Sequence, residues 1–174
     1  MSFSNSEFVP AQQGHLDGFC GVYACLNFFC RRFDVEPESK KGKALFRELL
    51  ADLERQDRLT VHRICEGFLE GHLQKAFNRV AKANKLMVKA RRFETFLKRF
   101  NAKAVFDGVA HLGDGEAAML SMNKGCHWVL AFDCDGQTMR VDDSSFEPRS
   151  LVWQREESRS LGLSKKDGLV FLNA

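Results

Sequence analysis

Residues 20–33 of this 174-residue chain read CGVYACLNFFCRRF, and only Asn27 interrupts the apolar or small residues between Gly21 and Arg31. Such a run predicts a helix, and a helix that is apolar on nearly every side must be buried on nearly every side. We therefore expect residues 20–33 to form the buried central helix of the fold, with Cys20 at its first turn. The residues before it, up to about residue 17, form a polar leader.

The patterns that follow residue 33 differ between the two halves of the chain. After a polar connection at 34–42, apolar residues recur at helical spacing in three stretches: KALFRELLADLERQ (43–56), about 60 to 85, and FETFLKRF (93–100). Beyond about residue 104 the apolar runs are short and are separated by Gly and Asp, which predicts strands of a mainly antiparallel sheet. These runs are residues 117–123, 126–134, 137–143 and 168–173.

Helices that precede strands in this way predict an α+β fold. The chain is 44% hydrophobic and 28% charged, the composition of a globular protein, and its length suits one core rather than two. We expect a single domain over residues 1–174, with a helical half at about 18–103 and a sheet half at about 104–174. The sequence shows neither a membrane-spanning apolar run nor a secretory signal, so a cytoplasmic location is expected and no membrane partner.

Six cysteines stand at positions 20, 25, 30, 65, 126 and 134, and no two of them form a CxxC pair. Without a secretory signal a disulfide framework is not expected, so the thiols should be free. Cys20 differs from the other five because it opens a helix, where unpaired N–H groups and the helix dipole favour the reactive thiolate. The other five lie in apolar or strand contexts and are expected to pack as small hydrophobic side chains.

A cysteine nucleophile needs an imidazole to carry its proton, and an acid or amide to orient that imidazole. His127 opens the strand 126–134, whereas the other four histidines lie in loop or helix contexts. The next strand ends in Asp142 and Asp143, and strand alternation allows only one of them on the His127 face. A two-residue DG loop would select Asp142, and a three-residue loop with Gly136 as a bulge would select Asp143.

QGHLDGFCGVYACLNFF (residues 13–29), followed about a hundred residues later by GCHWVLAFDCDGQTMRVDDSS (residues 125–145), resembles the papain-like cysteine peptidases. The resemblance is to the small bacterial peptidases related to the domains that process bacteriocin leaders. It implies a papain-like fold with Cys20 on the central helix and with the His and Asp on the antiparallel sheet.

The resemblance also assigns roles to single residues. It implies a Cys20, His127 and Asp143 triad that cleaves a peptide or amide bond through an acyl-enzyme thioester. Asp143, followed by Ser144, matches the family's spacing better than Asp142. The amide of Gln13 inherits the oxyanion-binding role, with Gln12 as the alternative. No cofactor and no metal ion are implied, and the expected partner is a peptide or protein substrate.

Three other interpretations stay open at this point. The same thiol machinery could deamidate a side chain or transfer an acyl group to an amine. Between residues 75 and 103 the chain carries ten Lys or Arg and one acid, a local charge of +9, whereas the rest of the chain has a net charge of −6. A papain-like module that has lost its catalytic activity could therefore bind an acidic protein or nucleic acid at this segment. The weakest alternative is a metal site made of His62, Cys65, Cys126, His127 and Cys134.

Overall fold

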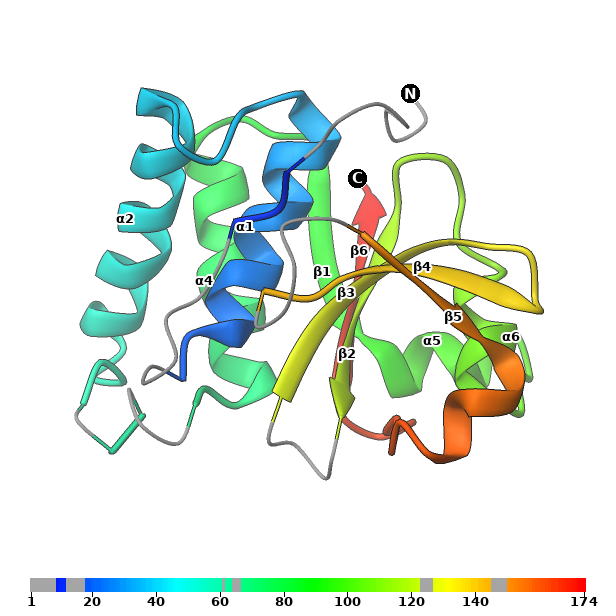
Figure 1. Cartoon of the computed structure of the whole chain (residues 1–174). Coiled ribbons are helices and arrows are strands. Elements are labelled where there is room, and N and C mark those ends of the chain that lie inside the picture. Colours follow the sequence, from blue (N-terminus) through cyan, green and yellow to red (C-terminus); the bar gives the residue numbers. More distant parts are fainter. Residues whose placement is uncertain (1–8, 12–17, 61, 64–66, 123–126, 145–149) are drawn as a thin grey trace.

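The structure, a computed structural model, describes residues 9–11, 18–60, 62–63, 67–122, 127–144 and 150–174. Its helices, in chain order, are α1 (Cys20–Phe33), α2 (Lys40–Arg55), α4 (Glu70–Ala83), α5 (Phe93–Arg99), α6 (Val105–Val109) and the 3₁₀ helix η2 (Arg155–Arg159). Figure 1 shows α1, α2 and α4 gathered on one side of the molecule. The bounds of α1 are those predicted from the sequence.

Six strands form one sheet in which every neighbouring pair is antiparallel. They are β1 (Val88–Arg92), β2 (Ala117–Met122), β3 (His127–Cys134), β4 (Thr138–Asp142), β5 (Leu151–Gln154) and β6 (Gly168–Asn173). Across the sheet their order is β1-β6-β2-β3-β4-β5. The α+β prediction, with helices mostly in the N-terminal part and the sheet in the C-terminal part, is confirmed.

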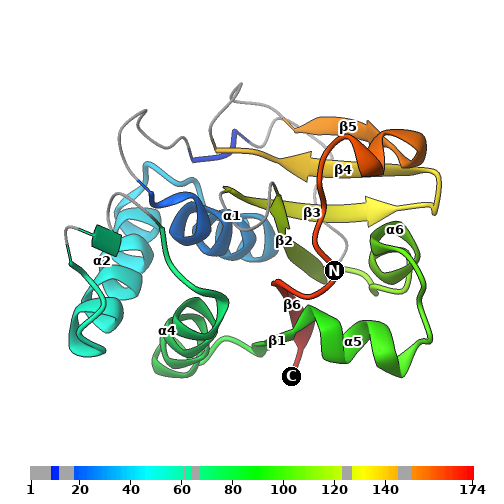
Figure 2. The same ribbon diagram turned by 90° about the horizontal axis from the view of Figure 1, so that it is seen from below.

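Helices cover both faces of this sheet, as the view in Figure 2 shows. On one face α1 contacts β2 and β3, while α4 contacts β1 and β6. The core there is rich in phenylalanine: Phe77 of α4 lies 4.4 Å from both Phe29 and Phe171, measured between ring centroids. Such stacks add to the energy of apolar burial and join α1, α4 and β6 in one core. The opposite face is covered by α5 and α6, which contact β6, β1, β3 and β4.

The structure differs from the sequence prediction in the middle of the chain. A single helix was expected from about 60 to 85, but α4 begins only at Glu70. Gly67 adopts a positive φ of 85° and Leu69 is extended, so the helical periodicity crosses a break. Strand β1 and helix α6 were not predicted, which places a strand in the half expected to be helical and a short helix in the half expected to be sheet. Strand β5 was also missed.

Strand β1 is an edge of the sheet, and its free edge is covered by α4. The side chain of Asn78 accepts a hydrogen bond from the Ala90 N–H at 2.7 Å and donates to the Ala90 carbonyl at 3.2 Å. Gln74 donates to the same carbonyl at 3.1 Å. Two helix side chains therefore take the place of a neighbouring strand at Ala90, which protects the edge from pairing with another chain.

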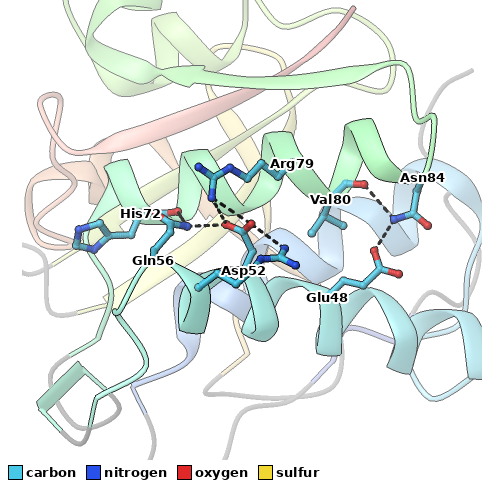
Figure 3. A network of polar contacts seen from close by, with 8 residues as sticks. Glu48, Asp52, Gln56, His72, Arg79, Val80 and Asn84 are labelled. Carbon is cyan, nitrogen blue, oxygen red and sulfur yellow. Dashed lines mark hydrogen bonds and ion pairs between the residues drawn. The ribbon is translucent and has the colours of Figure 1, made fainter.

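A buried acid joins α2 to α4, as the close-up in Figure 3 shows. Asp52 is fully buried on α2, and its carboxylate accepts hydrogen bonds from Gln56 at 2.6 Å and Arg55 at 3.0 Å. Arg79 of α4 approaches the same carboxylate at 3.4 Å. One turn away, Asn84 donates to Glu48 at 2.6 Å. These contacts compensate the buried charge of Asp52 and fix the helix pair that flanks α1.

Among the residues that the structure describes, no helix combines the length and the apolar character needed to cross a membrane.

Candidate active site

Cys20 is the first residue of α1, and its side chain is 4% exposed. The residue before the helix, Phe19, has no side-chain acceptor with which to cap the first N–H groups. Gly21 explains how the helix start comes so close to the sheet: a Cβ at this position would lie 2.5 Å from Leu73 Cδ1 and 3.2 Å from Trp128 Cδ1. A glycine after the cysteine therefore brings α1 against Trp128, the residue next to His127.

His127 is the first residue of β3, and its ring is held by a carboxylate. Nε2 lies 2.7 Å from Oδ1 of Asp143, and the exposed fractions of the two side chains are 18% and 1%. The side chain of Cys20 also forms a hydrogen bond with the ring. Because Nε2 faces Asp143, the nitrogen that faces Cys20 is Nδ1. The fold thus brings together three of the four residues selected from the sequence, across a separation of more than a hundred positions.

The register of β3 and β4 decides which aspartate meets His127. Leu130 pairs with Asp142, so these two residues share one face of the sheet. Strand alternation then places His127 and Asp143 together on the opposite face. The orienting contact of the imidazole is accordingly made by Asp143.

This register depends on a bulge that the sequence analysis placed elsewhere. The hairpin closes with Asp135 N–H donating to the Thr138 carbonyl at 3.2 Å, so Gly136, with a φ of 89°, and Gln137 form a two-residue turn. The extra residue is Asp133, which has a φ of 51° at the point where the β3–β4 register shifts. Neither loop considered from the sequence is the one observed, because the bulge lies inside the strand rather than at Gly136.

The surroundings of His127 determine its charge. Burial alone would lower its pKa, but hydrogen bonds to Asp143 and Cys20, and the negative charges of both groups, raise the pKa from 6.5 to about 9. At neutral pH the ring is therefore an imidazolium. An imidazolium carries a proton that can be given to a leaving group.

We expect the His127 ring to titrate with a midpoint of about 9, measured by NMR of the imidazole. Because this pKa is raised above the unfolded value of 6.5, the stability it contributes is present below about 6.5 and is lost as the pH rises through about 9. In Cys20→Ala, and in Asp143→Asn, one raising interaction is gone and the midpoint should fall. A parent midpoint at or below 6.5 would contradict this assignment.

Asp142 belongs to a different contact. Its carboxylate accepts hydrogen bonds from Arg31 Nε at 2.6 Å and Arg31 Nη2 at 2.8 Å, and from the Ser150 hydroxyl at 2.6 Å. The guanidinium also lies over the Phe132 ring, 4.1 Å from its centroid. Both charged side chains are almost completely buried. This clamp ties the last turn of α1 to the strand that leads to Asp143, and sequence reasoning missed it.

The other described cysteines lie away from this constellation. Burial raises the pKa of Cys25, and burial against a weaker opposing effect of Lys41 raises that of Cys30 to about 12. Burial also raises the pKa of Cys134, whose sulfur contacts the Phe106 carbonyl. These thiols stay protonated and unreactive near neutral pH.

Several predicted residues lie outside the described part of the chain. They are Gln12, Gln13, Cys65 and Cys126. The oxyanion-binding role of Gln13 therefore stays a prediction. Two of the five residues in the alternative metal site, Cys65 and Cys126, are among them. The described residues contain no group of three or more His, Cys, Asp or Glu side chains that could hold a metal ion.

The basic segment 75–103 lies on α4, β1 and α5. Part of its charge is used within the fold: with carboxylates of the described residues, three of its ten cations form the pairs Arg79–Asp52, Arg92–Glu70 and Lys98–Glu94. Docking of an acidic protein or nucleic acid at this segment stays a prediction.

Comparison with known proteins places the fold. No family model and no curated protein matches the sequence. The structure does match the crystal structure of a double-glycine-motif protease from an AMS/PCAT transporter, determined with its leader peptide. The match has a TM-score of 0.56 at 14% identity and covers 100% of this chain and 99% of that chain. The fold is papain-like.

The papain-like fold agrees with what the Cys20 and His127 motifs imply. The Pseudomonas avirulence protein AvrPphB was also found, at 13% identity, a TM-score of 0.42, and coverage of 97% of this chain and 98% of that chain. At 14% identity the likeness to the double-glycine-motif protease is one of fold. Within that papain-like frame, the helix start, the strand start and the end of β4 bring a thiol, an imidazole and a carboxylate into contact.

Proposed function

We propose that this protein is a papain-like cysteine hydrolase that cleaves a peptide or amide bond. The observation that carries the proposal is the contact chain from Cys20 to the His127 ring and on to Asp143, with 2.7 Å between Nε2 and Oδ1. A nucleophile, a proton carrier and an orienting carboxylate in this order are what thiol hydrolysis requires.

In the proposed reaction the Cys20 thiolate attacks the substrate carbonyl carbon. The oxyanion that forms is stabilised by the Cys20 backbone N–H and the side-chain amide of Gln13, or of Gln12. The His127 imidazolium, whose pKa is raised to about 9, gives its Nδ1 proton to the departing amine and leaves a thioester on the sulfur. Water then attacks the thioester carbonyl while His127 takes up a proton from the water. The acid product is released, and the thiolate and the imidazolium are regenerated.

Asp143 keeps the ring in the orientation this sequence needs. Its carboxylate accepts a hydrogen bond from Nε2–H, so Nδ1 is the nitrogen left to exchange a proton with sulfur, amine and water. We infer a peptide or protein substrate, because the structural neighbour was crystallised with a leader peptide. If the acyl donor were a glutamine side chain, hydrolysis by the same machinery would be deamidation, and if an amine replaced water as the acceptor the machinery would act as an acyl transferase.

Acyl-enzyme formation tests the proposal. After exposure to an activated peptide-like ester, intact-mass spectrometry should show a single acyl group, and peptide mapping should place it on Cys20. Cys25→Ala, which removes a buried thiol of the same helix, should acylate like the parent. Addition of a primary amine should show whether the acyl group leaves as an acid or as an amide. Acylation of another residue, or acylation that persists in Cys20→Ala, would refute the assigned nucleophile.

A further inference from the structure

Two adjacent aspartates end β4, and only one of them meets His127. Asp142 and Asp143 are each 1% exposed, so both carboxylates are buried. Up to Val141 the strand alternates between half-buried polar and buried apolar side chains, and this pattern favours one register on β3. Beyond Val141 the alternation is between two identical side chains. Neither size nor polarity therefore decides which of the two acids faces the imidazole.

Arg31 binds both carboxylate oxygens of Asp142. Its Nε donates to Oδ2 at 2.6 Å and its Nη2 donates to Oδ1 at 2.8 Å. The Ser150 hydroxyl accepts a hydrogen bond from Nη2 and donates one to Oδ1, so it closes the clamp from the far end of the β4–β5 connection. A guanidinium is always charged, and its planar fork matches the two oxygens of one carboxylate. The clamp holds Asp142 toward α1.

The buried charges at this end of the sheet form two separate pairs. Arg31 is paired with Asp142, and His127 is paired with Asp143 at 2.7 Å between Nε2 and Oδ1. Each of the two acids thus has one cation of its own. Because a buried charge without a partner is costly, an Asp142 carboxylate that lost Arg31 would be drawn to the other cation of these pairs, the imidazolium.

We propose that Arg31 is a positioning residue that commits Asp143 to His127. By holding Asp142 toward α1, it keeps the neighbouring carboxylate from competing for the imidazole, and it acts through Asp142 rather than on the substrate. The inference rests on the proposed function, in which Asp143 orients the His127 ring. An apolar pair of similar volume is often as stable as a buried ion pair, so stability alone does not account for the clamp.

Substitution of Asp143 in different backgrounds tests this role. In the parent, Asp143→Ala should lower the rate constant of p-nitrophenyl acetate hydrolysis by about 10⁴-fold, since Asp142 stays bound to Arg31. In Arg31→Met the same substitution should cost about 10 to 100 times less, because the released Asp142 can pair with His127; coupling between residues of one network has this size. When Arg31→Met is combined with Asp142→Leu, Asp143→Ala should again cost about 10⁴-fold, because neither carboxylate remains.

The titration of the His127 ring, followed by NMR, gives a second readout that does not depend on hydrolysis. In Asp143→Ala the midpoint should fall below about 9, since burial still lowers the pKa of the ring and the raising contact with Asp143 is gone. Adding Arg31→Met should raise the midpoint again, because Asp142 then supplies the negative charge. Further addition of Asp142→Leu should remove this recovery.

Urea unfolding shows whether each variant is folded under the assay conditions. Arg31→Lys serves as a second variant: it keeps the buried charge and so protects the fold, but it lacks the fork, and it should also reduce the loss caused by Asp143→Ala. A loss from Asp143→Ala that is equal in the parent and in both Arg31 variants, or a His127 midpoint that Arg31→Met does not recover, would overturn the positioning role. If Asp143→Ala leaves the rate of the parent unchanged, the orienting role of Asp143 in the proposed function fails instead.

Discussion

Cys20→Ala is expected to lower the rate constant of peptide or ester hydrolysis by about 10⁶-fold while the protein stays folded. Removal of the nucleophile or of its base lowers the rate constant of a triad hydrolase by about this factor. His127→Ala should lower it by a comparable factor. The reason lies in the contact between the two side chains: in the proposed mechanism the imidazolium is the counter-charge of the nucleophilic thiolate, so the loss of either group removes the same function. The effects of the two substitutions should therefore not multiply in the double variant.

The matched control for this prediction lies on the same helix. Cys25→Ala removes a fully buried thiol one turn further along α1 and should leave the hydrolysis rate unchanged. Circular dichroism and thermal unfolding should show that Cys20→Ala keeps the fold. Hydrolysis by Cys20→Ala at the parent rate would show that the site is elsewhere.

The two adjacent aspartates at the end of β4 are expected to affect different properties. Asp142→Ala removes the carboxylate that balances the charge of the Arg31 guanidinium, which is only 5% exposed. An uncompensated buried charge costs about 3–5 kcal/mol, so the free energy of unfolding should fall by that amount. Asp143→Ala should instead lower the hydrolysis rate by about 10⁴-fold, because the His127 ring loses the group that fixes its orientation.

Urea unfolding and initial-rate measurements on both variants check this separation. A matched control for the clamp is the double variant Arg31→Met with Asp142→Leu, since an apolar pair of similar volume should restore most of the stability lost in Asp142→Ala. The opposite outcome, with Asp142→Ala stable but inactive and Asp143→Ala active, would reverse the assignment of the two residues.

The helical and strand patterns were sufficient for most of the architecture. The apolar run 20–33 predicted α1 with its bounds, because a helix buried on all sides leaves an unbroken apolar signature. Strand β1 was missed because only Val88 and Ala90 of its five residues are buried, and the three basic residues look like a helix surface. The helix expected at 60–85 was drawn too long because periodicity alone does not show that Gly67 takes a positive φ.

The candidate site could be predicted as residue types but not as contacts. Cys20 and His127 were found from their places at a helix start and a strand start. Which aspartate joins them depends on the bulge at Asp133, and no sequence rule places a bulge at a non-glycine residue inside a strand. The Arg31–Asp142 clamp was equally hidden, because a basic residue in the last turn of a helix is normally exposed.

The central claim is that Cys20 is the reactive thiol and that His127 makes it so. The most direct test measures how fast each of the six cysteines reacts with iodoacetamide below neutral pH. Peptide mass spectrometry would map the alkylated cysteines in the parent and in His127→Ala. If Cys20 is a thiolate held beside an imidazolium, it should react far faster than the other thiols in the parent, and His127→Ala should remove most of that advantage. Similar rates at all accessible cysteines, or a Cys20 rate that His127→Ala leaves unchanged, would contradict the claim.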